Sequence, residues 1–301
     1  ITTVYVSLTT AILLSLWAAG MPFFDALNHA FSIAATGGFS TRNLSIGAYG
    51  SDTINFIVLF FMALCAMHFG LIYAVFATRS FKPFKNSVTA YYFGSIAVMS
   101  LLIMFSLLTE GGYDSFGRAV MDSTFTVVSY MSTAGFAICD NAEWPWLAGV
   151  VLLFASFQCA SAGSTTGGIK VDRILIAFKA ISNEIKHRLH PSSVSHTRFS
   201  GHHLADGAVS AVLMYIVVYF VVIFISIIAV MLCGCEATEA VSGVIASVGS
   251  VGPGLGELGC LDNYSAQPAM AKFIYAFDMF LGRVEIYPVL VVISMIFRRN
   301  R

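Results

Sequence analysis

The sequence predicts an all-α polytopic membrane protein with three tandem helix–pore loop–helix repeats, of an expected four, around a central ion pore. Two observations predict this fold class. First, 57% of the 301 residues are hydrophobic and only 11% are charged, whereas a soluble domain carries about 25% charged residues. Second, one motif occurs three times: an acidic residue is followed thirteen positions later by a glycine, with a hydroxyl residue two places before that glycine. An internal repeat of this kind decides the fold.

The repeated motif marks three candidate pore loops. Its copies run from Asp25 to Gly38, from Asp122 to Gly135 and from Glu239 to Gly252, and their hydroxyl residues are Thr36, Thr133 and Ser250. Each copy is a short apolar helical pattern that leads into a glycine turn between long apolar segments. An ordinary turn between helices would explain one copy. Three copies in register favour re-entrant loops.

Six long apolar segments flank these loops, and a spanning helix needs roughly 20 apolar residues. We expect spans near 2–19, 54–77, 88–108, 146–187, 207–233 and 269–297. Short pore helices are expected at 22–35, 114–132 and 236–248. The repeats then cover 1–86, 87–200, with a broken second helix, and 201–301. Three units leave a closed pore incomplete, so a fourth repeat is expected ahead of Ile1.

The distribution of charge sets the topology. Most basic residues follow the second span, lie in or after the broken span, or end the chain. The positive-inside rule places these segments in the cytoplasm of a cell (inner) membrane, with the pore loops outside. Most acidic residues lie on the outer side, where they would concentrate cations. Four of the six cysteines also lie there, as inert thiols or as a disulfide: Cys139, Cys233, Cys235 and Cys260.

The pore loops have the residue types that a cation filter needs. A dehydrated cation requires rings of carbonyl oxygens, and glycine allows the positive φ that turns a carbonyl toward an axis. The three acids would complement the positive ends of the pore helices. The candidate filter residues are Ala35, Thr36, Gly37, Gly38, Ser132, Thr133, Ala134, Gly135, Gly249, Ser250, Val251 and Gly252.

The segment SAGSTTGGIK (161–170) interrupts the fourth span with small, polar residues. A phosphate loop is disfavoured, because Ile169 takes the lysine position and no Ser or Thr follows Lys170. A packing kink and a hinged gate below the filter remain as alternatives. The candidate gate residues are Gly163, Ser164, Thr165, Thr166, Gly167, Gly168, Lys170 and, from the last span, Arg283.

The last span carries Asp278, Arg283 and Glu285. Charges at membrane depth usually face a cavity or a partner. In one continuous helix Arg283 and Glu285 lie about 200° apart, while Asp278 and Glu285 share a face. We therefore expect one face to meet the pore and the other a neighbouring helix, or else a buried ion pair. His68, in the second span, is expected to be a hydrogen-bonded packing residue rather than a proton relay.

Five segments together resemble the Trk/Ktr/HKT superfamily of potassium transporters, in particular its bacterial Trk-type membrane subunit. They are TGGFST (36–41), STAGF (132–136), AGSTTGGIKVDR (162–173), VGPGLGE (251–257) and GRVEIYPVLV (282–291). The resemblance covers the chain as the last three of that family's four repeats. It implies that Gly38, Gly135 and Gly252 are selectivity glycines, that 161–170 obstructs the pore, and that Arg283 is an electrostatic barrier beneath the filter.

The expected function is potassium uptake, with K+ as the transported ion and no cofactor in the chain. The alternatives are a sodium-permeable or cation-coupled relative and, remotely, a membrane enzyme, although no Ser–His or metal-ligand arrangement supports one. The resemblance implies a homodimer and a cytoplasmic nucleotide-binding (TrkA-like) ring subunit as partners, besides the lipid bilayer; no nucleic acid is expected. The basic loop 186–203 is either a topology anchor or the docking surface for that subunit.

Overall fold

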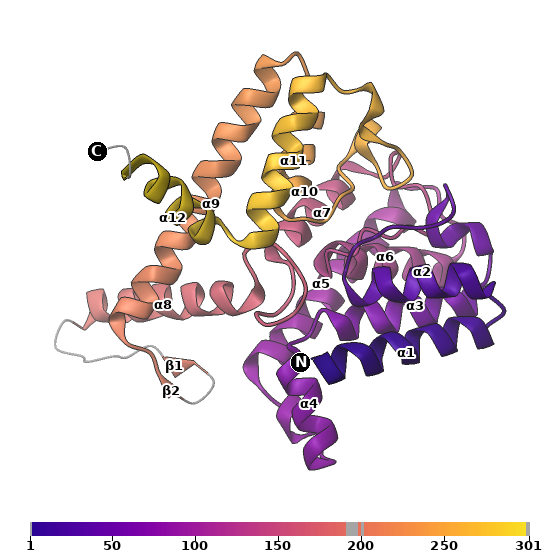
Figure 1. Cartoon of the computed structure of the whole chain (residues 1–301), viewed down its shortest axis with the longest axis horizontal. Coiled ribbons are helices and arrows are strands. Elements are labelled where there is room, and N and C mark those ends of the chain that lie inside the picture. The colour runs from indigo at the N-terminus through magenta and orange to yellow at the C-terminus, as the bar shows by residue number, and fades with distance from the viewer. Residues whose placement is uncertain (1, 191–197, 200–201, 299–301) are drawn as a thin grey trace.

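The computed structural model describes residues 2–190, 198–199 and 202–298, and it is almost entirely helical (Figure 1). Half of the predicted docking loop 186–203 lies outside the described residues, as do Arg299 and Arg301. Elements of the first third of the chain are α1 (Thr2–Ala18), α2 (Phe23–Ala34), η1 (Ser45–Tyr49), α3 (Asp52–Cys65), α4 (Phe69–Thr78) and η2 (Lys82–Phe84).

The middle of the chain repeats the order of a long helix, a short buried helix and a further helix. Its elements are α5 (Ser87–Thr109), α6 (Phe116–Met131), α7 (Trp146–Gln158), α8 (Val171–Leu189) and the antiparallel pair β1 (Arg198–Phe199) and β2 (His202–His203). Asn86 caps α5 by accepting a hydrogen bond from the Thr89 amide at 2.8 Å, which satisfies one of the free amides at a helix start.

The last third has the same order again. Its elements are α9 (Asp206–Leu232), α10 (Ala237–Val248), η3 (Gly256–Leu258), η4 (Tyr264–Ala266), α11 (Ala269–Val284) and α12 (Ile286–Arg298). In Figure 1, α9 and α11 run alongside each other, and α10 packs against both. The short helices α2, α6 and α10 lie at the three expected pore-helix positions.

Long apolar helices carry the chain through the bilayer. Among the described residues, α5 and α9 are long and apolar enough to cross a membrane, and two bent helix pairs pass the same test together. Their outer faces expose large apolar side chains such as Phe56, Phe105 and Phe224. Exposed apolar surface of this extent marks contact with hydrocarbon, so the chain is a membrane protein.

Two predicted spans are wrong as continuous helices. The segment near 54–77 divides into α3 and α4 at a bend of 97°, and the segment near 269–297 divides into α11 and α12 at a bend of 108°. His68 begins the second part of the first pair, where its Nδ1 accepts a hydrogen bond from the Gly70 amide at 2.9 Å. In the other pair, a continuous helix would press the Pro288 ring against the carbonyl of Val284. The chain turns instead at Glu285, with φ of 69°.

The break in the middle of the chain was predicted and is present. α7 ends at Gln158, α8 begins at Val171, and residues 159–170 between them form no helix. We call residues 159–170 the interrupting loop. A helix of 13 residues such as α7 is about 20 Å long, which is too short to cross a bilayer by itself. The interrupting loop therefore begins at membrane depth.

Candidate functional site

Three loops follow the short helices with the same unusual backbone. We call residues 35–38, 132–135 and 249–252 the first, second and third glycine loops. Their hydroxyl residues have left-handed φ angles of 52°, 53° and 56°, and the glycines two places later have φ of 73°, 70° and 101°. β-Branched residues such as threonine rarely adopt this region, and it costs them about 1–2 kcal/mol. Strain of this kind gathers at functional sites.

The strained hydroxyl residue in each loop ends the helix before it. In the first loop, the Thr36 amide donates to the Ile33 carbonyl at 3.1 Å and the Gly37 amide to the Ser32 carbonyl at 2.8 Å. This pair of bonds is a Schellman motif, in which glycine usually takes the left-handed position. The same two bonds recur in the second loop and in the third. A hydroxyl side chain therefore replaces the favoured glycine three times in equivalent places.

Neighbouring glycine loops touch through equivalent atoms. A β-carbon on Gly38 would collide with the carbonyl oxygen of Ala134, and one on Gly135 would lie 2.5 Å from the carbonyl oxygen of Val251. Ala134 and Val251 each stand one place before the glycine of the next loop. A β-carbon on the third glycine, Gly252, would meet no atom of the described residues within 4 Å. The three loops thus follow one another by one repeated step, with open space at the end of the series.

The interrupting loop joins the first and third glycine loops. The Thr36 hydroxyl lies 2.7 Å from the Ala35 carbonyl and 3.2 Å from the Thr165 carbonyl. The Thr165 hydroxyl donates to the Ala34 carbonyl at 3.4 Å. On the other side, a β-carbon on Gly167 would lie 2.7 Å from the carbonyl oxygen of Gly249. Residues predicted as filter and as gate are therefore in direct contact.

Arg283 reaches the first glycine loop from the far end of the chain. Its Nη2 donates to the Ala35 carbonyl at 3.0 Å, and its Nη1 donates to the Thr36 hydroxyl at 3.4 Å. The side chain comes so close because α11 packs tightly on α10: a β-carbon on Gly282 would overlap the carbonyl oxygen of Val248. Arg283 itself remains exposed, so its charge borders open space beside the loop.

Glu285 binds Lys170, the last residue of the interrupting loop, and Arg173 in the first turn of α8. Its carboxylate accepts from Lys170 Nζ at 2.9 Å and from Arg173 Nη2 at 2.8 Å. The Arg173 guanidinium also stacks on the Tyr215 ring of α9, 3.9 Å from its centre. Lys170, which was predicted to act in the gate, is therefore an ion-pair partner at its edge. Together these contacts fasten the end of the interrupting loop to the break between α11 and α12.

The expectation that Asp278 and Glu285 share a helix face is wrong, because α11 ends at Val284. Asp278 faces α9, where its Oδ1 accepts from the Ser226 hydroxyl at 2.8 Å. Its Oδ2 has no hydrogen-bond partner among the described residues. Glu285 therefore forms ion pairs, but with its side chain 35% exposed rather than buried, and Asp278 forms none among the described residues.

The interrupting loop has its own internal supports. The Ala162 amide donates to the Asp172 carboxylate at 2.5 Å. The Ser164 and Thr166 hydroxyls lie 2.7 Å apart, within hydrogen-bond distance. A β-carbon on Gly163 would overlap the His68 ring. His68 is thus hydrogen-bonded and packed, as expected, but at a helix break and against this loop.

The three repeated acids are partnered, and two of them are buried. Asp25 accepts from Thr41 at 2.7 Å and from Arg42 at 3.1 Å. The Thr41 bond lowers the pKa of Asp25 against the effect of burial, and the Arg42 bond adds to the lowering. Asp122 accepts from Tyr113 and Arg118, and lies nearly two turns inside α6 rather than near its start. Glu239 accepts from Gln267 at 2.7 Å. Asp25 therefore holds the segment that follows the first glycine loop, and Asp122 holds residues at the start of α6 and just ahead of it.

The six cysteines are free thiols, so the outer four form no disulfide. Burial raises the pKa of Cys260 to about 12 and that of Cys139 further still. Protonated, buried thiols react slowly.

Several contacts at this site were not predicted. Asp172 and Arg173 follow the interrupting loop directly, and their charge at membrane depth was an available signal. The contacts of Tyr264 and Tyr130 had no such signal in the sequence. The Tyr264 hydroxyl donates to the Gly252 carbonyl at 2.8 Å, and the Tyr130 hydroxyl donates to the Gly254 carbonyl at 3.1 Å. Such long-range contacts leave no mark in the local sequence.

The fold and the site define the class of this protein: it is a helical membrane protein with three short helices that each lead into a glycine loop. Residues 1–300 match the family model described as TrkH, cation transport protein. The chain belongs to this TrkH family of cation transport proteins.

Named relatives and one solved structure agree with this assignment. The Trk system potassium uptake protein TrkH of Salmonella typhimurium is 35% identical over 99% of this chain and 61% of its own length. TrkG of Escherichia coli is 33% identical over 94% of this chain and 58% of its own. The crystal structure of the potassium transporter TrkH from Vibrio parahaemolyticus matches with a TM-score of 0.89 at 34% identity, over 96% of this chain and 62% of that one. The chain thus spans about three fifths of the length of these relatives.

Proposed function

We propose that this chain forms most of the pore of a potassium uptake protein. The observation that carries the proposal is the repeated step between glycine loops, from Gly38 to Ala134 and from Gly135 to Val251. Equivalent carbonyls placed by one repeated step can surround a common axis, which is how backbone oxygens replace the hydration shell of an ion. The relatives named as potassium uptake proteins support potassium as the ion.

A further loop beside Gly252 would complete the ring. In the described part of the chain, a Gly252 β-carbon would meet no atom within 4 Å beyond its own chain neighbours, while the other two glycines are each covered by a neighbouring carbonyl. The proposed units are residues 1–86, 87–200 and 201–301, and a fourth unit would provide the missing neighbour. The longer relatives have enough additional chain for it.

The interrupting loop and Arg283 would control passage below the filter. The loop contacts the first and third glycine loops, and Arg283 places a positive charge beside Ala35. A fixed cation near the path raises the electrostatic barrier to K+. Opening would require the loop to leave these contacts, and its glycines with positive φ, Gly163 and Gly168, are the candidate hinges. This mechanism needs no covalent chemistry.

The proposed orientation places the glycine loops toward the outside of a cell (inner) membrane and the basic segments in the cytoplasm. A homodimer and a cytoplasmic nucleotide-binding ring subunit are the proposed partners, with loop 186–203 as the docking surface. Copurification of such a subunit, lost when the basic residues of this loop are replaced, would test the contact. Unchanged copurification would contradict it.

The function is tested by ion influx. The full natural reading frame that contains this chain is expressed in cells without potassium uptake of their own, and rubidium influx is measured with and without competing sodium. Saturable influx that resists sodium and changes in Gly135→Ser is expected. Influx blocked by sodium would identify a sodium-permeable relative, and influx that depends on a proton or sodium gradient a coupled one. No influx from protein shown to be in the membrane would contradict the pore assignment.

A further inference from the structure

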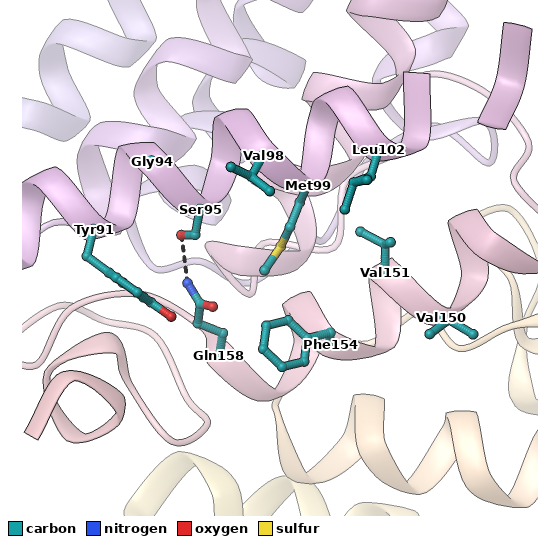
Figure 2. A pocket seen from close by; sticks show the side chains of 10 residues that line it. All are labelled: Tyr91, Gly94, Ser95, Val98, Met99, Leu102, Val150, Val151, Phe154 and Gln158. Carbon is teal, nitrogen blue, oxygen red and sulfur yellow. Dashed lines mark hydrogen bonds between the residues drawn. The ribbon is translucent and has the colours of Figure 1, made fainter. Parts of the chain in front are cut away.

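A pocket of about 590 Å³ opens between α5 and α7, apart from the glycine loops (Figure 2). Its walls include Val98 and Met99 from α5 and Val150 and Phe154 from α7. Val98, Val150 and Phe154 each keep more than half of their surface exposed, so the pocket opens outward, where α5 faces hydrocarbon. None of its described lining residues is charged. The volume is that of a site for a small organic molecule.

One buried amide forms the polar end of this pocket. Gln158, the last residue of α7, is fully buried, and its Nε2 donates to the Ser95 hydroxyl oxygen at 2.6 Å. Its Oε1 has no hydrogen-bond partner among the described residues. A buried acceptor without a donor is unfavourable, so this oxygen needs a partner that the described chain does not provide.

The orientation of the amide follows from Ser95. The Ser95 hydroxyl donates its one hydrogen to the Tyr92 carbonyl at 2.9 Å, so Ser95 can only accept from Gln158. Nε2 must therefore face Ser95, and Oε1 must face away from it. In Figure 2 the amide oxygen of Gln158 points between Met99 and Phe154.

The chemistry of the walls selects the occupant. The polar groups of the lining gather at one end of the pocket: the Gln158 amide, the Ser95 hydroxyl and the Tyr91 hydroxyl. Water could fill only that end, because a water molecule needs two to four polar partners. An ion or a lipid headgroup would find no opposite charge, and a plain hydrocarbon chain would leave the oxygen unpaired. We propose that this pocket binds a lipid-soluble alcohol, with its apolar body between α5 and α7 and its hydroxyl donating to Gln158.

The site adjoins the candidate gate, and this consequence rests on the proposed function. Gln158 is followed by Cys159, which has φ of 44° and begins the interrupting loop. The carbonyl of Ser156, in the same turn, would lie 2.7 Å from a β-carbon on Gly249 in the third glycine loop. A bound alcohol would thus hold the end of α7 that supports both the loop and the filter.

Binding is tested without measuring transport. The full natural reading frame is placed in bilayers with either a photoreactive long-chain alcohol or its methyl ether, which has the same body but no donor. Labelled peptides are then mapped. We expect the alcohol to label α5 and α7 about tenfold more than the ether, since one hydrogen bond to a buried acceptor has about this effect. Gln158→Met should reduce alcohol labelling to the level of the ether.

A matched pair of substitutions tests the pocket itself. A β-carbon on Gly94, in its wall, would meet no atom within 4 Å, so Gly94→Leu fills the pocket without strain and should abolish labelling. Ala97→Leu, on an exposed face of the same helix outside the lining, should leave it unchanged. Equal labelling by alcohol and ether, or labelling that survives Gly94→Leu, overturns the proposal. So do crosslinks between two copies of the chain across this face. If the protein binds the alcohol but transports no ions, the proposed pore function is refuted and the proposed alcohol site is not.

Discussion

The guanidinium of Arg283 donates a hydrogen bond to the carbonyl oxygen of Ala35 across 3.0 Å, although 248 residues separate them. One residue belongs to α11, near the end of the chain, and the other to the first glycine loop. The contact joins the last third of the chain to the first glycine loop. It also gives one of the proposed filter carbonyls a protein donor in place of an ion.

Replacing Arg283 should therefore ease ion entry. Arg283→Gln removes a unit charge beside the path, and a barrier lower by about 1.4 kcal/mol corresponds to roughly tenfold faster rubidium influx. Arg283→Lys keeps the charge and should stay near the parent rate. Lys82→Gln, which removes an exposed positive charge from η2, is the control and should change nothing. An unchanged rate in Arg283→Gln would contradict the barrier role.

Substitutions at two glycines distinguish the effect of backbone strain from the effect of a changed filter geometry. Gly135 and Gly112 have nearly equal φ of 70° and 67°, but a β-carbon would lie 2.5 Å from the Val251 oxygen in the first case and meet nothing within 4 Å in the second. Both alanine variants should lose about 1–2 kcal/mol of stability from the left-handed backbone. Only Gly135→Ala should also lose discrimination of rubidium against sodium. Equal selectivity in the two variants would argue against a filter at Gly135.

The sequence predicted the glycine loops well, because each motif is local and occurs three times. It also predicted the break at 161–170, where small residues are consecutive. The breaks at His68 and Glu285 were missed because each lies inside a long, mainly apolar segment, which predicts one continuous span. Pro288 was an available signal, since its ring excludes a helix through Val284. The contact of Glu285 with Lys170 could not be predicted, because it joins two breaks that are 115 residues apart.

The ion pairs of Glu285 should hold the interrupting loop in place. The Glu285 side chain is 35% exposed, so screening reduces the effect, and Glu285→Gln should cost about 1–2 kcal/mol, the value for hydrogen bonds to charged groups. Lys170→Met and the double variant complete a thermodynamic cycle, measured by thermal unfolding in detergent. A coupling energy near zero would mean that the pair does not hold the loop.

The Asp25 carboxylate should make the first glycine loop sensitive to acid. Because the Thr41 bond lowers the Asp25 pKa below its ordinary 3.8, the ionised form stabilises the folded state above that pH. This stabilisation is lost as the pH falls through the lowered value. Thr41→Val should reduce the thermal midpoint at pH 7 and flatten its decline in acid below about pH 4. The same decline in both proteins would show that another group controls it.

Asp278 should be neutral in the folded protein. Among the described residues it has one hydrogen bond, from Ser226, and no ion-pair partner, and an unpaired buried carboxylate would take up a proton instead. Asp278→Asn keeps the shape of the side chain and the oxygen that accepts from Ser226, so the free energy of unfolding should change by less than about 1 kcal/mol. Ser226→Ala removes that hydrogen bond and should lower the free energy of unfolding by about 1 kcal/mol. Thermal unfolding of both variants provides the comparison. A loss of about 3–5 kcal/mol in Asp278→Asn would instead show that Asp278 is ionised and paired with a cation.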